Sequence, residues 1–174
     1  SEQGVEIAPR MPAISHGTAC AGLVGARLNR DMVHGAVPKC ELMLVAVEDV
    51  TSTLAVANAI TICVEGFAKG RGADVISGSI GPELGVWDYD ENLRKAVDHA
   101  HKAGRGTCGV PVVWASFNFE KEIPSNSLEA HVICVSRAGY GDQRVSSGFG
   151  LALDLLAPGT CIAVFDGSGV DELS

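Results

Sequence analysis

The residue whose type is best suited to catalysis is His16. It stands in a run of small residues, S-H-G-T-A-C-A-G-L-V-G-A, at positions 15–26. An imidazole can take up a proton and return it near neutral pH, so a histidine held in a cleft can act as general base and then as general acid. Single histidines are more often structural, and His16 therefore needs support from the rest of the chain. Cys20 follows four residues later and is expected to lie near the imidazole.

Two further segments place polar residues directly after short apolar runs. Val75-Ile76 is followed by S-G-S-I-G at positions 77–81, and V-V at 112–113 is followed by W-A-S-F-N, which ends at Asn118. In open parallel sheets, ligands bind where the carboxyl ends of the strands meet. A Gly- and Ser-rich exit is also typical of a simple turn, so neither segment indicates an activity when taken alone.

Alternating strand and helix patterns position these segments. Apolar, largely β-branched runs predict buried strands at 42–47, 73–77, 110–115 and 132–136. Helical patterns cover 15–28, 54–68 and 88–103, with Ser52 or Thr53 available as an N-cap for the second helix. This order predicts one α/β domain over residues 1–174, built as a doubly wound, mostly parallel sheet with helices on both faces.

Charge and composition exclude several classes of function. The net charge is -8 and Lys and Arg do not cluster, which argues against nucleic-acid partners. No apolar run approaches the ~20 residues that span a bilayer, and the first ten residues do not resemble a signal peptide, so no membrane partner is expected and the compartment stays open. A nucleotide site is disfavoured because no glycine-rich phosphate loop follows any strand.

The cysteines indicate neither a metal site nor a redox motif. Six are present, far apart and without a C-x-x-C pair: Cys20, Cys40, Cys63, Cys108, Cys134 and Cys161. Most stand in apolar runs, where a free thiol behaves as a small hydrophobic side chain. The residues themselves therefore predict buried free thiols and no metal or other cofactor.

Four segments taken in order resemble the subtilisin-like serine peptidases, the subtilases. They are H-G-T-A-C-A-G at 16–22, S-G-S-I-G at 77–81, W-A-S-F-N at 114–118 and L-D-L-L-A-P-G at 153–159. The resemblance implies that His16 is the catalytic base and that Asn118 donates to the oxyanion. It also implies that Ser79, Ile80 and Gly81 bind the substrate backbone, with Ala115, Ser116 and Phe117 beside them. The implied activity is the hydrolysis of peptide bonds by a Ser-His-Asp triad.

The other two members of that triad are not visible. Fifteen residues precede His16, and Glu2 and Glu6 are not in the strand context of a subtilase aspartate. Ser168 lies too close to Gly159 to be the nucleophile and is expected to form a turn. We therefore expect an incomplete domain that is inactive alone, with Asp and Ser supplied by further segments or by a second chain.

Two points bear on substrate and cofactor. Where the family usually has A-A-G-N, this chain has A-S-F-N, and the Phe117 ring is expected to narrow the main specificity pocket. Many subtilases bind calcium, but no ligands for it are identifiable in this sequence. A catalytically inactive subtilase-like module that binds a peptide or a partner is the alternative to a peptidase.

Overall fold

The computed structural model describes residues 15–27, 34–67, 71–82, 85–160, 162–165 and 170–173. These residues form two compact units, one from residues 1–42 with 161–174 and the other from residues 43–160. The predicted single domain over 1–174 stays a prediction. No helix among the described residues has the length and apolar character needed to cross a membrane.

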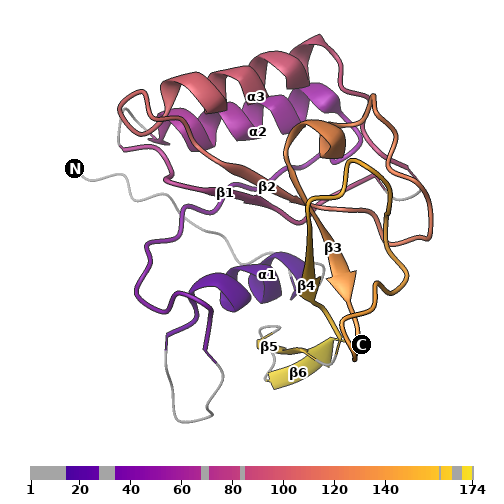
Figure 1. Cartoon of the computed structure of the whole chain (residues 1–174). Coiled ribbons are helices and arrows are strands. Elements are labelled where there is room, and N and C mark those ends of the chain that lie inside the picture. The colour runs from indigo at the N-terminus through magenta and orange to yellow at the C-terminus, as the bar shows by residue number, and fades with distance from the viewer. Residues whose placement is uncertain are drawn as a thin grey trace. The chain divides into compact units, whose positions relative to one another are not determined.

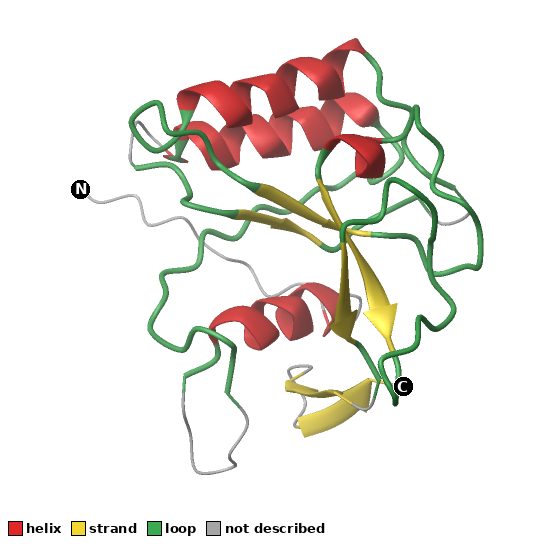
Figure 2. Cartoon of the chain, viewed as in Figure 1, coloured by secondary structure: helices red, strands yellow, loops and turns green. Residues whose placement is uncertain are grey.

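A parallel sheet forms the centre of the larger unit. Its strands are β1 (Ile76–Gly78), β2 (Val112–Ala115), β3 (Ile133–Ala138) and β4 (Leu155–Pro158), and they are paired in that order. Helices α2 (Thr53–Glu65) and α3 (Glu91–Ala103) lie side by side on one face of the sheet (Figure 1). The connections from β2 to β3 and from β3 to β4 are mostly loop, with the short helix η3 (Leu128–His131) in the first (Figure 2).

Local signals explain where α2 begins and ends. The Ser52 side chain accepts a hydrogen bond from the backbone amide of Ala55 at 3.3 Å, so the predicted N-cap is confirmed. At the other end Gly66 adopts a positive φ of 79°, and its amide donates to the carbonyl of Ile62. The helix therefore ends at Glu65, earlier than predicted.

Helix α3 begins later than its sequence pattern predicts. Asp88 bridges to Ser127 and the amide of Tyr89 donates to Asn126, so residues 88–89 are held in an extended conformation. Asp90 is the N-cap, and its carboxylate accepts hydrogen bonds from the amides of Asn92 and Leu93, each at 3.0 Å. Pairing with a distant segment thus sets the first residue of the helix.

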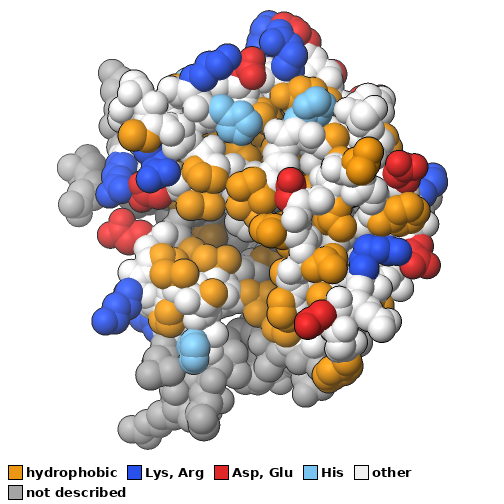
Figure 3. Space-filling model, in the orientation of Figure 1, with side chains coloured by type: hydrophobic (Ala, Val, Ile, Leu, Met, Phe, Trp, Pro, Cys, Tyr) orange, Lys and Arg blue, Asp and Glu red, His pale blue; other side chains and the backbone are white. Residues whose placement is uncertain are grey.

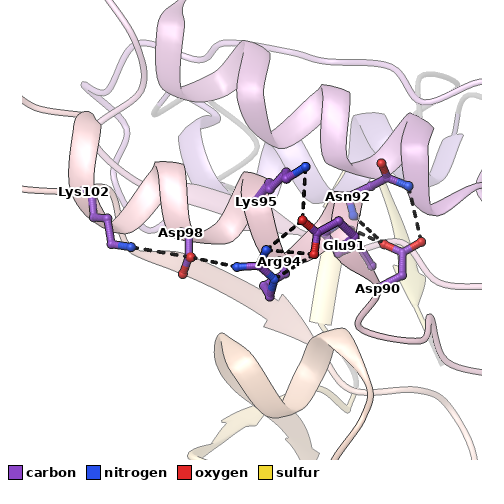
Figure 4. A network of polar contacts seen from close by, with 8 residues as sticks. Asp90, Glu91, Asn92, Arg94, Lys95, Asp98 and Lys102 are labelled. Atoms are coloured by element: carbon purple, nitrogen blue, oxygen red, sulfur yellow. Dashed lines mark hydrogen bonds and ion pairs between the residues drawn. The ribbon is translucent and has the colours of Figure 1, made fainter.

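The outer face of α3 carries a chain of ion pairs (Figure 4). Glu91 pairs with Arg94 and Lys95, and Asp98 pairs with Lys102. These side chains are half-exposed to exposed, and ion pairs at such positions contribute little to stability. Figure 3 shows this charged surface over α3. The helix is held mainly by its apolar face.

One apolar cluster joins the two helices to the sheet. Its members come from both helices, from β1 and β2, and from the segments that flank them, and those with the largest buried side chains are Val56, Ile60, Leu93, Val97, Val110, Val112, Trp114 and Leu128. Their burial stabilises the unit through the removal of apolar surface from water. The cluster therefore supports the carboxyl ends of β1 and β2, where the candidate site lies.

The smaller unit contains helix α1 (Ser15–Gly25) and an antiparallel pair, β5 (Ile162–Phe165) and β6 (Val170–Leu173). The helix ends before its predicted limit, and Leu28 lies outside the described residues. Its last carbonyls, on Leu23 and Val24, accept hydrogen bonds from the amides of residues 36 and 37. This returning segment satisfies the groups that a further helical turn would have used.

One strand assignment from the sequence was wrong, and strands β4, β5 and β6 were not predicted. Residues 42–47 are not a strand, because no described segment pairs with them. Their alternating exposure, with Leu42 and Leu44 exposed and Val47 packed against the core, is nevertheless that of an extended chain. In contrast, β4 was not predicted, although its residues pair with β3 from Val135↔Leu155 to Ala138↔Pro158.

Candidate active site

His16 occupies the first turn of α1, in the smaller unit. Its side chain is exposed, and the Sγ atom of Cys20 lies 3.8 Å from Nδ1 and 3.9 Å from Nε2. The predicted closeness of this thiol to the imidazole is therefore confirmed. Further along the helix, Gly25 lets the segment that carries Cys40 approach closely, because a Cβ atom at Gly25 would lie 2.9 Å from the sulfur of Cys40.

Asn118 lies three residues beyond the end of β2, in the larger unit. Its side chain is exposed and forms no hydrogen bond with any described residue. The segment that carries it is well anchored, since the amide of Ser116 donates to Val135 at 2.8 Å and the carbonyl of Phe117 accepts from Gly148 at 3.2 Å. A free amide on an anchored segment can donate to an oxygen that develops negative charge.

A buried chain of hydroxyl groups fixes this segment to β3. The hydroxyl oxygens of Ser116 and Ser136 are 2.7 Å apart, and Ser136 donates to the carbonyl of Gly148 at 2.6 Å. Because the Ser136 proton is used in this way, its lone pairs accept from Ser116. The Ser116 side chain points inward, so a contact with substrate at this position falls to its backbone.

Phe117 fills the interior beside the same segment. Its ring is buried and packs with Ile123 and Cys134, and it stacks on Phe119 with the ring centroids 4.5 Å apart. Gly148 completes the fit, since a Cβ atom there would lie 3.2 Å from the Phe117 ring. The space that a smaller residue would leave open at this position is thus occupied.

The segment after β1 presents unpaired backbone groups. Among the described residues, neither Ser79 nor Gly81 has a backbone hydrogen-bond partner. The intervening carbonyl of Ile80 accepts a hydrogen bond from the indole nitrogen of Trp114 at 3.1 Å. Ala115 follows Trp114 in the sequence, is the last residue of β2 and is exposed.

The structure brings part of the predicted site together. Ser79–Gly81 and Ala115–Asn118 follow neighbouring parallel strands, whose register pairs Gly78 with Trp114. His16 belongs to the other compact unit, so a shared cleft between His16 and Asn118 stays a prediction. Glu2, Glu6 and Ser168 lie outside the described residues.

Three residues of this region were missed by sequence reasoning: Trp114, Ser136 and Glu129. Trp114 offers a weak signal, because a large aromatic residue in one strand beside a glycine in the next suggests a packed pair. Ser136 offers none, since its partners Ser116 and Gly148 are distant in the sequence, and Glu129 offers none, since its burial is not visible in the local pattern.

A hollow of about 530 Å³ opens beside this region. It is lined by Glu122, Ile123, Pro124, Ser125, Ala130, Leu151 and Ala152. A second hollow of about 270 Å³ is lined by residues 101, 105 and 108–111. Neither contains a predicted site residue.

The prediction of buried free thiols holds for only some of the described cysteines. The five described cysteines are free thiols, of which Cys134 is buried and Cys108 is exposed, and Cys161 is outside the described residues. Burial raises the pKa of the Cys134 thiol to about 12, and the nearby carboxylates of Glu129 and Asp154 add to this shift. Among the residues that the structure describes, no group of three or more His, Cys, Asp or Glu side chains could hold a metal ion.

Glu129 is a buried carboxyl group without a full set of partners. Its side chain is 2% exposed and its Oε2 atom has no hydrogen-bond partner among the described residues. Burial raises the pKa of this carboxyl group, although its own amide and the Ser127 hydroxyl act in the opposite direction. The native state therefore keeps a proton that the unfolded chain loses as the pH rises past the ordinary value.

Glu129→Gln is expected to change how stability depends on pH. In the parent protein the free energy of unfolding falls as the pH rises through the raised pKa, because the unfolded state then binds fewer protons than the native state. The amide cannot ionise, so the variant should gain stability relative to the parent at pH 7 and not at pH 4. Urea unfolding across this range measures the difference, with Glu48→Gln as an exposed control. An unchanged pH slope in Glu129→Gln would contradict the assignment.

Comparison with known proteins identifies relatives of this chain. Two curated relatives named calcium-dependent protease, from Trichormus variabilis and a Nostoc species, are each 29% identical to this chain over 154 residues. The alignments cover 80% of this chain and 22% of each relative, so the chain spans less than a quarter of their length. Among solved structures, sphericase is 20% identical with a TM-score of 0.67, covering 91% of this chain and 57% of that one.

The likeness to sphericase confirms the predicted doubly wound α/β fold. A family model described as Peptidase_S8, the subtilase family, matches residues 5–174. This match covers nearly the whole chain and includes each of the segments on which the resemblance rests. The chain therefore belongs to the subtilase family.

Proposed function

We propose that this chain is the part of a serine endopeptidase that carries the general base and the oxyanion donor. Membership of the subtilase family supports the reaction class. The observation that carries the proposal is the Asn118 side chain, which is exposed and has no hydrogen-bond partner among the described residues, on a segment anchored by Ser116 and Phe117. An amide with a structural task would be bonded to the protein, whereas this one is available to a substrate oxygen.

The proposed mechanism uses two groups of this chain. His16 takes the proton of the nucleophilic serine as that serine attacks the peptide carbonyl, and it then returns the proton to the leaving amine. Asn118 donates a hydrogen bond to the oxyanion of the tetrahedral intermediate. Serine and aspartate come from residues outside these 174, either elsewhere in the full-length protein or in a second chain.

The substrate is proposed to bind as an extended strand beside Ser79–Gly81. The unpaired backbone groups of Ser79 and Gly81 support this mode, because main-chain hydrogen bonds hold a peptide without reading its side chains. Selectivity then depends on the neighbouring pocket. The partners are peptides or proteins, and no nucleic-acid or membrane partner is proposed.

Calcium enters this proposal only through the relatives. Both curated relatives are named calcium-dependent protease. Among the described residues, no group of three or more His, Cys, Asp or Glu side chains could hold a metal ion. The proposed peptidase mechanism therefore assigns no step and no ligand of this chain to calcium.

Hydrolysis of a peptide series by the full-length protein tests the proposal. We expect cleavage of succinyl-Ala-Ala-Pro-X anilides when X is Gly or Ala, and little cleavage when X is Leu or Phe, because we propose that the Phe117 ring, which is buried against Ile123 and Cys134, narrows the specificity pocket. A phosphonyl fluoride, which phosphonylates an activated serine oxygen with loss of fluoride, should abolish the activity. Peptide binding without hydrolysis would refute the peptidase and identify the inactive peptide-binding module instead.

Phe117→Gly sharpens this test. Removing the ring should widen the preference toward X = Leu or Phe, while cleavage at X = Ala continues. The control is Phe149→Gly, whose ring lies beside Arg144 and outside the Phe117 cluster. If Phe117→Gly keeps the parent preference, the ring is not part of the pocket wall.

A further inference from the structure

Trp114 and Gly78 form a packed pair across β1 and β2. The register places them opposite one another, and the Trp114 side chain is 4% exposed. A Cβ atom built on Gly78 would lie 2.0 Å from Cε3 and 2.2 Å from Cζ3 of the indole. Gly78 is therefore the residue that lets the indole lie flat against the strand that leads into the Ser79–Gly81 segment.

The indole also holds the segment after β1 by a hydrogen bond. Trp114 Nε1 donates to the carbonyl of Ile80 at 3.1 Å, and the Ile80 side chain packs against the core. Successive peptide groups of an extended chain point to opposite sides. With the Ile80 carbonyl turned toward Trp114, the backbone groups of Ser79 and Gly81 face away from it, where they have no described backbone partner.

A second tryptophan packs edge to face against the first. The rings of Trp87 and Trp114 meet edge to face, with centroids 5.6 Å apart and planes at 76°. Trp87 Nε1 donates to the carbonyl of Val50 at 2.9 Å, a group that lies far from residues 79–81 in the sequence. The chain contains only these two tryptophans, so Trp87 provides a matched indole for comparison with Trp114.

We propose that Trp114 is the positioning residue for the substrate-binding edge: its indole holds Ile80 so that Ser79 and Gly81 present their backbone groups to an extended peptide. This inference rests on the proposed function, because it takes residues 79–81 as the segment that pairs with substrate. A segment ordered in advance loses less conformational entropy when a peptide binds. Trp114 should therefore act on substrate binding and not on the chemical step.

Kinetics of the full-length protein test the role of the indole hydrogen bond. Trp114→Phe keeps an aromatic ring but loses the donor, and KM for succinyl-Ala-Ala-Pro-Ala anilide is expected to rise about five- to tenfold, the size of one lost hydrogen bond. The turnover number should stay within about twofold, because Asn118 and His16 are untouched. Trp87→Phe is the matched control, since it also loses one indole donor of the same pair, and both constants should stay near the parent values.

A second measurement does not depend on hydrolysis. Backbone ¹⁵N order parameters for residues 79–81 are expected to fall from about 0.85 to about 0.6 in Trp114→Phe and to stay high in Trp87→Phe. In the parent protein, titration with the peptide acetyl-tetra-alanine should shift the indole proton signal of Trp114 and leave that of Trp87 in place. Because this uses the parent protein, it holds even if a variant folds poorly.

The outcomes separate this inference from the function on which it rests. If the order parameters and KM respond equally in the two variants, or in neither, Trp114 does not position the segment. If the parent protein hydrolyses no peptide but acetyl-tetra-alanine shifts the Trp114 signal and the order parameters fall as expected, the positioning role stands and the peptidase is refuted. If the peptide shifts neither indole signal, the substrate-binding edge itself is refuted.

Discussion

His16→Ala is expected to lower the turnover number of the full-length protein by about 10⁵- to 10⁶-fold with little change in KM. The size is the one known for the triad histidine of subtilisin, a member of the same family, and is carried over from it. In the proposed mechanism no other group takes the proton of the attacking serine, and the substitution leaves the proposed substrate-binding edge untouched. Steady-state kinetics on succinyl-Ala-Ala-Pro-Ala anilide measure both constants.

Two controls accompany this variant. His34→Ala removes another exposed histidine of the same unit and should leave turnover unchanged. Cys20→Ala removes the thiol 3.8 Å from the imidazole and tests whether the base depends on it. A His16→Ala protein that retains even a tenth of the parent turnover would take His16 out of the mechanism.

Asn118→Ala is expected to lower turnover by about 100- to 1,000-fold, again with little effect on KM. This magnitude, too, is the one measured for the oxyanion-hole asparagine of subtilisin. The oxyanion exists only along the reaction path, so its donor contributes to the transition state and not to substrate binding. The Asn118 amide is exposed and has no hydrogen-bond partner in the part of the chain that the structure describes, so the substitution removes no structural contact there.

Asn92→Ala supplies the matched control, because Asn92 is an exposed asparagine on α3 that donates only to Asp90. The double variant His16→Ala with Asn118→Ala examines the predicted shared cleft. Groups that act as one catalytic unit give losses that fall well short of multiplying. Losses that multiply in full would place the two residues in independent roles, and normal turnover in Asn118→Ala would remove it from the oxyanion hole.

Much of the fold could be predicted because its signals are local. Ser52 was predicted as a candidate cap for α2 from its position before a helical pattern, and three of the four predicted strands lie within two or three residues of β1, β2 and β3. The site segments were predictable for the same reason, since Ser79–Gly81 and Ala115–Asn118 directly follow two of these strands. Their neighbourhood then follows from parallel pairing of β1 with β2.

The errors occurred where distant segments compete with local preference. The helical pattern of α3 starts at Asp88, but the bridge from Asp88 to Ser127 holds this residue in an extended conformation. The helix therefore begins at Glu91. Residues 42–47 have the composition of a strand, yet a strand needs a neighbour, and none of the described segments pairs with them. The composition of a segment does not show whether a distant segment will pair with it.

The sequence by itself determined the family, the parallel α/β pattern and the residue types available for catalysis, because these depend on short motifs and on hydrophobic periodicity. Only the tertiary structure decided that Phe117 is buried against Ile123, that Trp114 bonds the carbonyl of Ile80, and that Glu129 lacks a partner for Oε2. The physical reason is that burial and hydrogen bonding are properties of groups brought together from separate segments. Trp114 and Ile80 are 34 residues apart, and no pattern within either segment shows that the chain will join them.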